Sequence, residues 1–201
     1  MRVTVIDYKA GNLTSVLKAL RHLGAEPVVT DSDLSAIEIA ERIVLPGVGH
    51  FAATERLDST GMTPAIRAAV KRGVPFLGIC VGMQWLYAGS TEAQEQNGLG
   101  FFEERCSRFP DGTEKVPHVG WNSLEVKGSS LLLSGVNDGE FVYFTHSYRA
   151  PVTADTSAET NYIEPFAAAV ERGNVMGVQF HPEKSGETGL KILRNFLEWA
   201  C

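Results

Sequence analysis

Short apolar runs alternate with amphipathic segments along the first half of the chain. The runs Arg2–Asp7, Glu26–Val29 and Arg42–Leu45 have the length and residue types of strands. Between the first two runs, leucines and a valine recur at helical spacing, which predicts a helix that begins after Asn12 and ends at Gly24. Strands that alternate with helices in this way indicate a parallel sheet covered on both faces.

The same alternation continues to the middle of the chain and then changes. Thr63-Pro64 opens a second helix that Gly73 closes, and Val74–Ile79 follows as a buried strand. From about Leu99 onward the apolar runs are shorter and are separated by turn residues, which is typical of antiparallel strands. Val116–Val126 and Phe141–Tyr148 are the clearest of these runs.

The last third of the chain contains a hairpin pattern followed by a helix. Phe166–Arg172 and Val175–Phe180 flank Gly173-Asn174, a residue pair suited to a two-residue hairpin turn. A final helix is expected from about Glu187 to Trp199, and the polar stretch Thr153–Thr160 is expected to be a surface loop. Together the elements predict an α/β fold with an open, largely parallel, flavodoxin-like central sheet, flanking helices and an antiparallel β extension in the second half.

Length and composition narrow the class of protein. A chain of 201 residues fits one domain over residues 1–201, since about 100 to 200 residues usually form one compact unit. A net charge of −6 without a basic run argues against a nucleic-acid partner. No apolar run reaches the roughly 18 to 20 residues of a membrane helix, and the first apolar run is too short for a signal peptide. Three cysteines, an odd number, favour a reducing cytoplasm over a disulfide framework, and no Cys/His spacing predicts a metal site or another cofactor.

The strongest local motif is Gly78-Ile79-Cys80-Val81-Gly82, where a buried strand is expected to turn into a helix. A nucleophile on such a turn needs glycine neighbours so that the helix can approach the strand. Backbone N–H groups of the helix would also favour a thiolate and an oxyanion. The alternative is a buried structural cysteine, and the motif alone gives the two interpretations about equal weight.

A second motif, His181-Pro182-Glu183, follows the strand at Val175–Phe180. Residues two apart in extended backbone face the same way, with Cα atoms about 6 to 7 Å apart, so Glu183 can reach the imidazole of His181. Alone, such a pair is more often an exposed histidine beside an exposed glutamate. With Cys80 it completes a nucleophile, a base and an orienting carboxylate, which is the set that acyl transfer requires.

A third motif, Pro46-Gly47-Val48-Gly49, ends another predicted parallel strand. Ligands of open α/β sheets bind at the carboxyl ends of strands, so this loop is a candidate oxyanion hole. Considered alone, it is more simply explained as a tight turn.

These motifs together resemble the class I, triad-type glutamine amidotransferases, and the resemblance extends over essentially all 201 residues. Three segments narrow it to the glutaminase subunits of imidazole glycerol phosphate synthase, of histidine biosynthesis: Pro46-Gly47-Val48-Gly49, Pro117-His118-Val119-Gly120-Trp121-Asn122, and Ile6-Asp7-Tyr8 followed by Gly11-Asn12-Leu13. Tyr143-Phe144-Thr145-His146-Ser147-Tyr148 and Lys184-Ser185 fit the same family. The resemblance implies that glutamine is the substrate and that Cys80, His181 and Glu183 are catalytic. It further implies oxyanion and glutamine-binding roles for Val48, Gly49, Val81, Gln84, Glu92, Ser147 and Tyr148.

The resemblance also implies a partner, a TIM-barrel cyclase subunit that receives the ammonia in a heterodimer. The expected docking residues are Asn12, Trp121, Tyr143 and Lys184, although Trp121 could equally be a core aromatic residue. One position departs from the family pattern, because Lys9 stands in the first loop where glycine is expected.

Three alternatives remain open at this stage. The chain could serve another synthase, such as pyridoxal phosphate synthase, whose glutaminase would share the triad. It could be a flavodoxin-like cysteine hydrolase or redox sensor, although such proteins lack the His-Pro-Glu segment at this position. It could also be a regulatory module without catalysis, against which the intact triad argues.

Overall fold

The main structural element is an eight-stranded mixed sheet with the strand order β2-β1-β3-β4-β14-β13-β12-β9. The computed structural model describes residues 1–11, 13–112 and 114–199. The parallel half consists of β2 (Glu26–Thr30), β1 (Arg2–Ile6), β3 (Ile43–Gly47), β4 (Phe76–Cys80) and β14 (Val175–Val178). The predicted open, largely parallel sheet is thereby confirmed.

The antiparallel half extends the sheet through β13 (Glu164–Arg172), β12 (Thr156–Tyr162) and β9 (Glu125–Val126). The predicted hairpin is confirmed, since Arg172 pairs with Val175 across the turn. The expectation of a surface loop at Thr153–Thr160 is wrong, because most of this segment is β12 and its Thr156, Ser157, Ala158 and Thr160 are buried.

The polar composition of β12 is compatible with burial because its side chains are small and can be hydrogen-bonded. The hydroxyl of Thr160, for example, donates to the carbonyl of Ser123 at 2.9 Å. Buried hydroxyl groups with a partner avoid most of the desolvation cost of an unpaired one. Composition alone therefore gave a misleading prediction for this strand.

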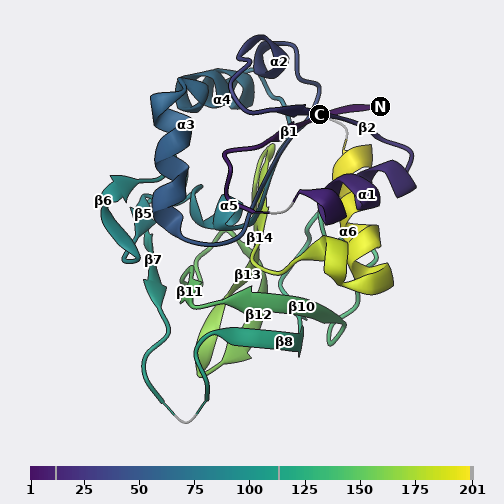
Figure 1. Cartoon of the computed structure of the whole chain (residues 1–201). Coiled ribbons are helices and arrows are strands. Elements are labelled where there is room, and N and C mark those ends of the chain that lie inside the picture. Colours follow the sequence, from purple (N-terminus) through teal and green to yellow (C-terminus); the bar gives the residue numbers. More distant parts are fainter. Residues whose placement is uncertain (12, 113, 200–201) are drawn as a thin grey trace.

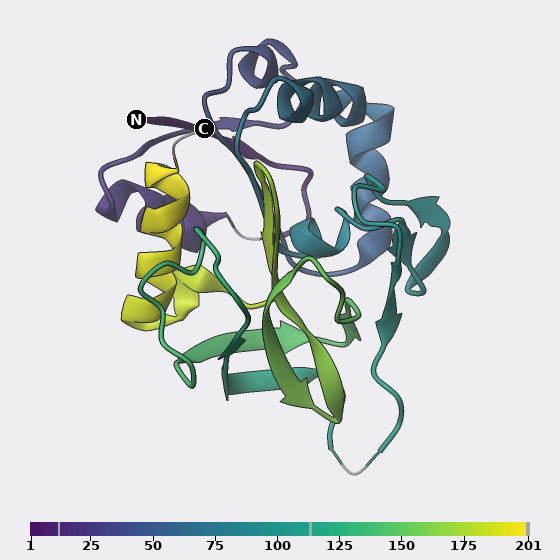
Figure 2. The ribbon, with the colours of Figure 1, turned by 180° about the vertical axis from the view of Figure 1, so that it is seen from behind.

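Helices cover both faces of the sheet. α1 (Thr14–His22) and α6 (Gly186–Glu198) lie on one face, and α3 (Glu55–Ser59) and α4 (Met62–Lys71) lie on the other (Figures 1 and 2). Strands covered on both sides are apolar at every position rather than alternately. β3 and β4 follow this rule, since all of their residues are buried.

The predicted ends of the helices agree with the structure to within one or two residues. Gly24 and Gly73 follow α1 and α4 with φ angles of 80° and 90°, in the left-handed region where glycine stops a helix without strain. Asn12, the expected cap of the first helix, lies outside the described residues.

Two smaller sheets surround the carboxyl end of the main sheet. β8 (His118–Ser123) and β10 (Phe141–His146) form an antiparallel pair, which lies at the bottom of Figure 1. A four-stranded sheet has the order β11-β7-β5-β6. Its strands are β5 (Gly89–Ser90), β6 (Ala93–Asn97), β7 (Arg105–Arg108) and β11 (Tyr148–Arg149). The sequence predicted the short helix after Cys80, which is α5 (Val81–Gln84), but not the short helices α2 (Ser35–Glu38), η1 (Phe51–Thr54) and η2 (Pro182–Lys184).

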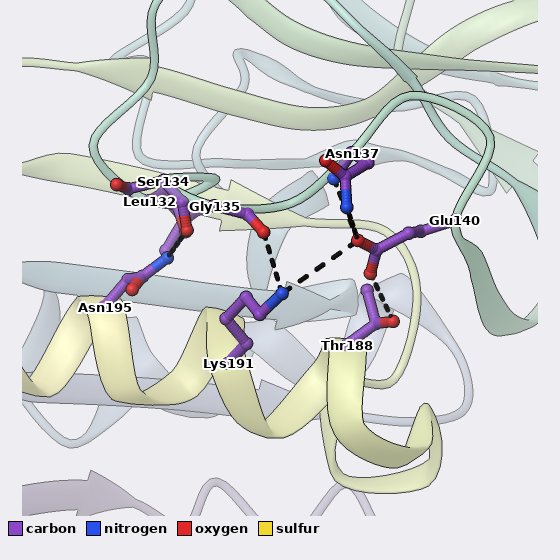
Figure 3. Close-up of polar contacts among 8 residues, drawn as sticks. All are labelled: Leu132, Ser134, Gly135, Asn137, Glu140, Thr188, Lys191 and Asn195. Carbon is purple, nitrogen blue, oxygen red and sulfur yellow. Dashed lines mark hydrogen bonds and ion pairs between the residues drawn. The ribbon is translucent and has the colours of Figure 1, made fainter.

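Polar contacts attach the segment between β9 and β10 to the last helix (Figure 3). Lys191 of α6 donates to the carbonyl of Gly135 at 2.7 Å, and Thr188 donates to the Glu140 carboxylate at 2.6 Å. One turn farther along, the amide of Asn195 donates to the carbonyls of Leu132 and Ser134. These bonds fix α6, whose first turn directly follows the His181–Glu183 segment.

Candidate active site

Cys80 lies on a strained turn at the end of β4. Its φ angle of 55° and ψ angle of −109° place a residue with a side chain where glycine is usually required. A Cβ atom on Gly78 would lie 2.4 Å from the carbonyl oxygen of Gly82, and a Cβ on Gly82 would lie 1.8 Å from that of Leu45. The two glycines are therefore steric requirements of the turn that presents the sulfur.

The neighbouring strand β14 brings His181 and Glu183 to the same edge of the sheet. Gly78 and Ile79 of β4 pair with Gly177 and Val178 of β14, so both chain segments leave the sheet side by side. The His181 Nδ1 atom donates to Glu183 Oε1 at 2.9 Å, and both side chains are buried. The backbone N–H of His181 is also held, by the carbonyl of Tyr143 at 2.9 Å.

The carboxylate of Glu183 determines the tautomer of the His181 ring. A carboxylate only accepts, so Nδ1 carries the proton and Nε2 remains available. Within the described residues, Nε2 of His181 and Oε2 of Glu183 are buried and have no hydrogen-bond partner. A buried ring nitrogen without a partner is expected where a proton must be exchanged rather than held.

The electrostatics of the site favour a protonated imidazole. Burial lowers the pKa of His181, but the interaction with Cys80 and then that with Glu183 act in the opposite direction and prevail. The result raises the pKa of His181 to about 10. Nε2 has no hydrogen-bond partner in the described conformation, so the imidazole is free to exchange its proton with the sulfur. An imidazolium beside a thiolate is the state from which cysteine nucleophiles react.

A cleft of about 210 Å³ opens beside the sulfur. The structure brings together in its wall all of the residues predicted to bind substrate except Val48. The lining residues are Gly49, Cys80, Val81, Gln84, Glu92, Pro117, Thr145, His146, Ser147 and Tyr148. The volume is suitable for a small polar molecule rather than a macromolecule.

The Val48 loop has a conformation in which its peptide faces away from the sulfur. The Val48 N–H donates to the carbonyl of Ala10 at 2.9 Å, so it is not directed toward Cys80. The loop is packed closely, since a Cβ on Gly11 would lie 2.0 Å from the Val48 side chain. At the other end of the loop, Glu92 Oε2 accepts the Phe51 N–H at 2.7 Å. Glu92 thus anchors this segment as well as lining the cleft.

Two buried glutamine side chains connect the cleft to the nucleophile. Gln84 Nε2 donates to the carbonyl of Tyr148 at 2.9 Å and to Gln179 Oε1 at 3.0 Å. Gln179 Nε2 in turn lies 3.6 Å from Cys80 Sγ. Gln179 was not among the residues predicted from the sequence. A glutamine inside the apolar run Val175–Phe180 was the available signal, because a polar residue in a buried strand needs a buried partner.

The β8–β10 pair carries two of the predicted docking residues, Trp121 and Tyr143, and a third, Lys184 of η2, lies next to them. Trp121 is 56% exposed and is therefore not a core residue. Tyr143 pairs with Trp121 across the two strands, and their rings are 6.1 Å apart. The Lys184 ammonium lies 5.7 Å from the centre of the Tyr143 ring. Three of the four predicted residues are thus adjacent, and the fourth, Asn12, lies outside the described residues.

Other residues singled out by the sequence lie apart from this chemistry. Cys106 is fully buried, and burial raises the pKa of its thiol, while Cys201 lies outside the described residues. Lys9 has a φ of 64°, which explains why glycine was expected there, and its ammonium forms ion pairs with Asp7 and Asp31. Over residues 1–11, 13–112 and 114–199, His, Cys, Asp and Glu side chains form no cluster of three or more that could hold a metal ion. In the same ranges no helix combines the length and the apolarity needed to cross a bilayer.

Comparisons with known proteins agree with this geometry. The family model of class-I glutamine amidotransferases matches residues 4–199. The imidazole glycerol phosphate synthase subunit HisH of Methanosarcina acetivorans is 46% identical to the chain, with 98% of each protein covered. The HisH subunit of Aquifex aeolicus is also 46% identical, with 98% of this chain and 96% of the relative covered.

A solved structure described as a glutamine amidotransferase has the same fold, with a TM-score of 0.76, 22% identity and coverage of 98% of this chain and 97% of the other. Since the family model spans nearly the whole sequence, the chain belongs to the class-I glutamine amidotransferases.

Proposed function

We propose that the chain, as one amidotransferase domain over residues 1–201, hydrolyses glutamine to glutamate and ammonia and supplies the ammonia to a synthase subunit. The observation that carries the proposal is the position of Cys80 on its strained turn beside the buried His181–Glu183 pair, at the edge of a cleft. A strained nucleophile, an oriented base and an adjoining cleft are the requirements of acyl transfer through a cysteine.

In the first half-reaction, His181 Nε2 holds the proton of the Cys80 thiol, and the sulfur attacks the side-chain carboxamide carbon of glutamine. The carbonyl π electrons move onto oxygen and form a tetrahedral oxyanion. When the oxyanion collapses, the C–N bond breaks, His181 transfers its proton to the leaving nitrogen, and ammonia departs from a γ-glutamyl thioester. Glu183 stabilises the imidazolium without itself becoming protonated.

In the second half-reaction, water attacks the thioester carbon while His181 accepts one of its protons. The C–S bond then breaks, glutamate leaves, and the sulfur again pairs with the imidazolium. The backbone N–H groups of Val81, Gly49 and Val48 are the proposed oxyanion donors. Loss of one such donor typically costs about 3 to 4 kcal/mol of transition-state stabilisation.

Gln84, Glu92, Ser147 and Tyr148 are proposed to hold the rest of the glutamine molecule, since all four line the cleft. Glu92 has the charge to bind the α-ammonium group. Gln84 uses its amide nitrogen for internal bonds, so its Oε1 atom is the one proposed to face the substrate.

We further propose that the partner is the TIM-barrel cyclase of a cytoplasmic imidazole glycerol phosphate synthase. Support comes from the HisH relatives, which are named as subunits of that enzyme and match over nearly their full length. The docking face proposed for the cyclase consists of Trp121, Tyr143 and Lys184, where the exposed Trp121 and the half-buried Tyr143 are next to a cation. Exposed aromatic residues of this kind are characteristic of interface hot spots.

The test is glutamate release from glutamine by the purified chain mixed with the cyclase subunit and its nucleotide substrate. We expect release that requires Cys80, so that Cys80→Ala retains the fold and the partner but loses activity by at least about a thousandfold. Cys106→Ala, which removes a buried thiol outside the triad, is the matched control. Undiminished activity in Cys80→Ala would contradict the proposed nucleophile.

A further inference from the structure

The backbone carbonyl of Tyr148 determines which side-chain groups of Gln84 and Gln179 donate and which accept. The Tyr148 oxygen can only accept, so the Gln84 side chain must present its NH₂ group to it. That same NH₂ group faces Gln179, which must therefore present its Oε1 atom. The remaining NH₂ group of Gln179 is consequently the part that faces Cys80 Sγ, at 3.6 Å.

We propose that Gln179 is a further catalytic residue, whose side-chain amide donates a hydrogen bond to the Cys80 sulfur and stabilises its thiolate. The proposal rests on the proposed function in taking Cys80 as the nucleophile. A donor to the charged form of an acid favours that form, and hydrogen bonds to ionised groups are about twice as strong as neutral ones. Because Gln179 is fully buried, water cannot replace this bond.

Of the other described groups around the sulfur, only His181 also favours the thiolate. Sγ donates to the Thr145 carbonyl at 3.9 Å, a contact that favours the thiol rather than the thiolate. His181 Nε2 has no hydrogen-bond partner in the described conformation, but its interaction with Cys80 is the largest of those that raise the pKa of the imidazole, so His181 and Gln179 stabilise the thiolate together. The helix that follows Cys80, α5, has only four residues, so its dipole is small. In the described part of the chain, Gln179 is the one side chain that donates to Sγ.

The position of Gln179 is fixed by a longer series of buried hydrogen bonds. The Tyr148 carbonyl that orients Gln84 also accepts from His146 Nδ1 at 2.9 Å. His146 therefore accepts at Nε2, where His118 Nδ1 donates at 3.2 Å. His118 is stacked between the rings of Tyr162 and Phe144, so this end of the series is held by packing. The side-chain NH₂ group of Gln179 is therefore already oriented toward the sulfur. Little conformational entropy is lost when the thiolate forms.

The experiment measures the rate of alkylation of Cys80 by iodoacetamide as a function of pH, in wild type and Gln179→Met. Methionine retains the length and shape of glutamine but has no N–H donor. Peptide mass spectrometry counts Cys80 separately from Cys106 and Cys201. We expect the rate at pH 7 to fall about tenfold and its midpoint to move to higher pH, because one charge-assisted hydrogen bond is lost. Gln179→Glu, which adds a negative charge beside the sulfur, should lower the rate further.

Thr160→Val is the matched control, since it removes another buried hydrogen bond that lies outside this series. It should alkylate as wild type does. If Gln179→Met retains the wild-type rate and midpoint, the proposal is overturned. Alkylation requires neither glutamine nor a partner. A failure of this proposal can therefore be distinguished from a failure of the proposed glutaminase activity.

A second measurement uses the wild-type protein, in case the substituted chains do not fold. The side-chain NH₂ resonances of Gln179, observed by ¹⁵N NMR, should shift as Cys80 ionises and should lose that dependence in Cys80→Ala. Resonances that do not respond to Cys80 would also overturn the proposal.

Discussion

The N–H of Val48 donates a hydrogen bond to the carbonyl of Ala10, at 2.9 Å, instead of pointing toward Cys80. A peptide group held in this way cannot stabilise an oxyanion on the opposite side of the loop. The next residue, Gly49, has a φ of 102°. Because glycine has no side chain, the backbone after Val48 can rotate without a steric clash. In the described conformation the residues of the proposed triad are therefore close together, whereas the loop proposed to bind the oxyanion would have to turn.

The first prediction concerns activity without a partner. If the competent loop is a minor conformation of about 0.1 to 10% in the isolated chain, the lone subunit should be about 10- to 1000-fold less active than the complex. Glutamate release measured with and without the cyclase and its nucleotide ligand tests this. Equal rates would contradict the coupling of the loop to the partner.

The second prediction concerns Glu183. Glu183→Gln retains the size of the side chain but removes the charge that stabilises the imidazolium, so kcat should fall about 10²- to 10⁴-fold with a small change in KM. Glu187→Gln, the same charge change at an exposed position of α6, is the control. A wild-type kcat in Glu183→Gln would show that His181 does not depend on its carboxylate.

The third prediction concerns stability at acid pH. Burial lowers the pKa of His118 to about 4 and, with smaller contributions from its neighbours, that of His146 to about 3. A depressed pKa means that the unfolded chain binds protons more readily, so stability is lost as pH falls from about 6.5 toward 4. The contribution of His181, whose pKa is raised, is complete below pH 6.5 and decreases only as pH rises toward 10.

Urea unfolding between pH 6.5 and 4 measures this effect. The free energy of unfolding of wild type should fall by up to roughly 3 kcal/mol more than that of His118→Asn, whose side chain does not titrate. His22→Asn, at an exposed position, should follow wild type. A wild-type dependence on pH in His118→Asn would contradict the assignment.

The fourth prediction concerns the docking face. Trp121→Ala should raise the dissociation constant of the cyclase complex about 10- to 100-fold while changing the stability of the chain by less than about 0.5 kcal/mol. Leu131→Ala is the matched control, since Leu131 is also exposed, at 60%, but lies in the segment between β9 and β10. Calorimetric titration measures both affinities. A larger effect at Leu131 would place the interface elsewhere.

The parallel half of the fold could be predicted because its strands are apolar throughout and its glycines stop helices at defined positions. Gly24 and Gly73 gave correct ends for two helices. β12 could not be predicted, because the hydrogen bonds of its Thr156 and Thr160 and the packing of its Ser157 are supplied only by the folded chain. β6 is mostly polar and exposed, so it has no apolar alternation from which to recognise a strand.

The nucleophile, the base and the orienting carboxylate of the candidate site could be predicted, because acyl transfer requires particular residue types at these positions. The glycines beside Cys80 prove to be steric requirements of its turn, and the His-Pro-Glu spacing places Glu183 within hydrogen-bonding distance of His181. Gln179 could not be assigned, since its contact with the sulfur depends on the register between β4 and β14. The direction of the Val48 N–H could not be assigned either, because its bond to the Ala10 carbonyl depends on how the loop folds.

Tyr143 is bonded on both sides to the segment that carries the base: its carbonyl accepts the His181 N–H, and its N–H donates to the Ser185 hydroxyl. The same residue belongs to the proposed docking face. Natural variation that adapts this face to a different synthase is therefore restricted to side chains. Insertions, deletions or a proline in β10 would displace His181, so families that diverge in partner choice should retain the backbone of this strand.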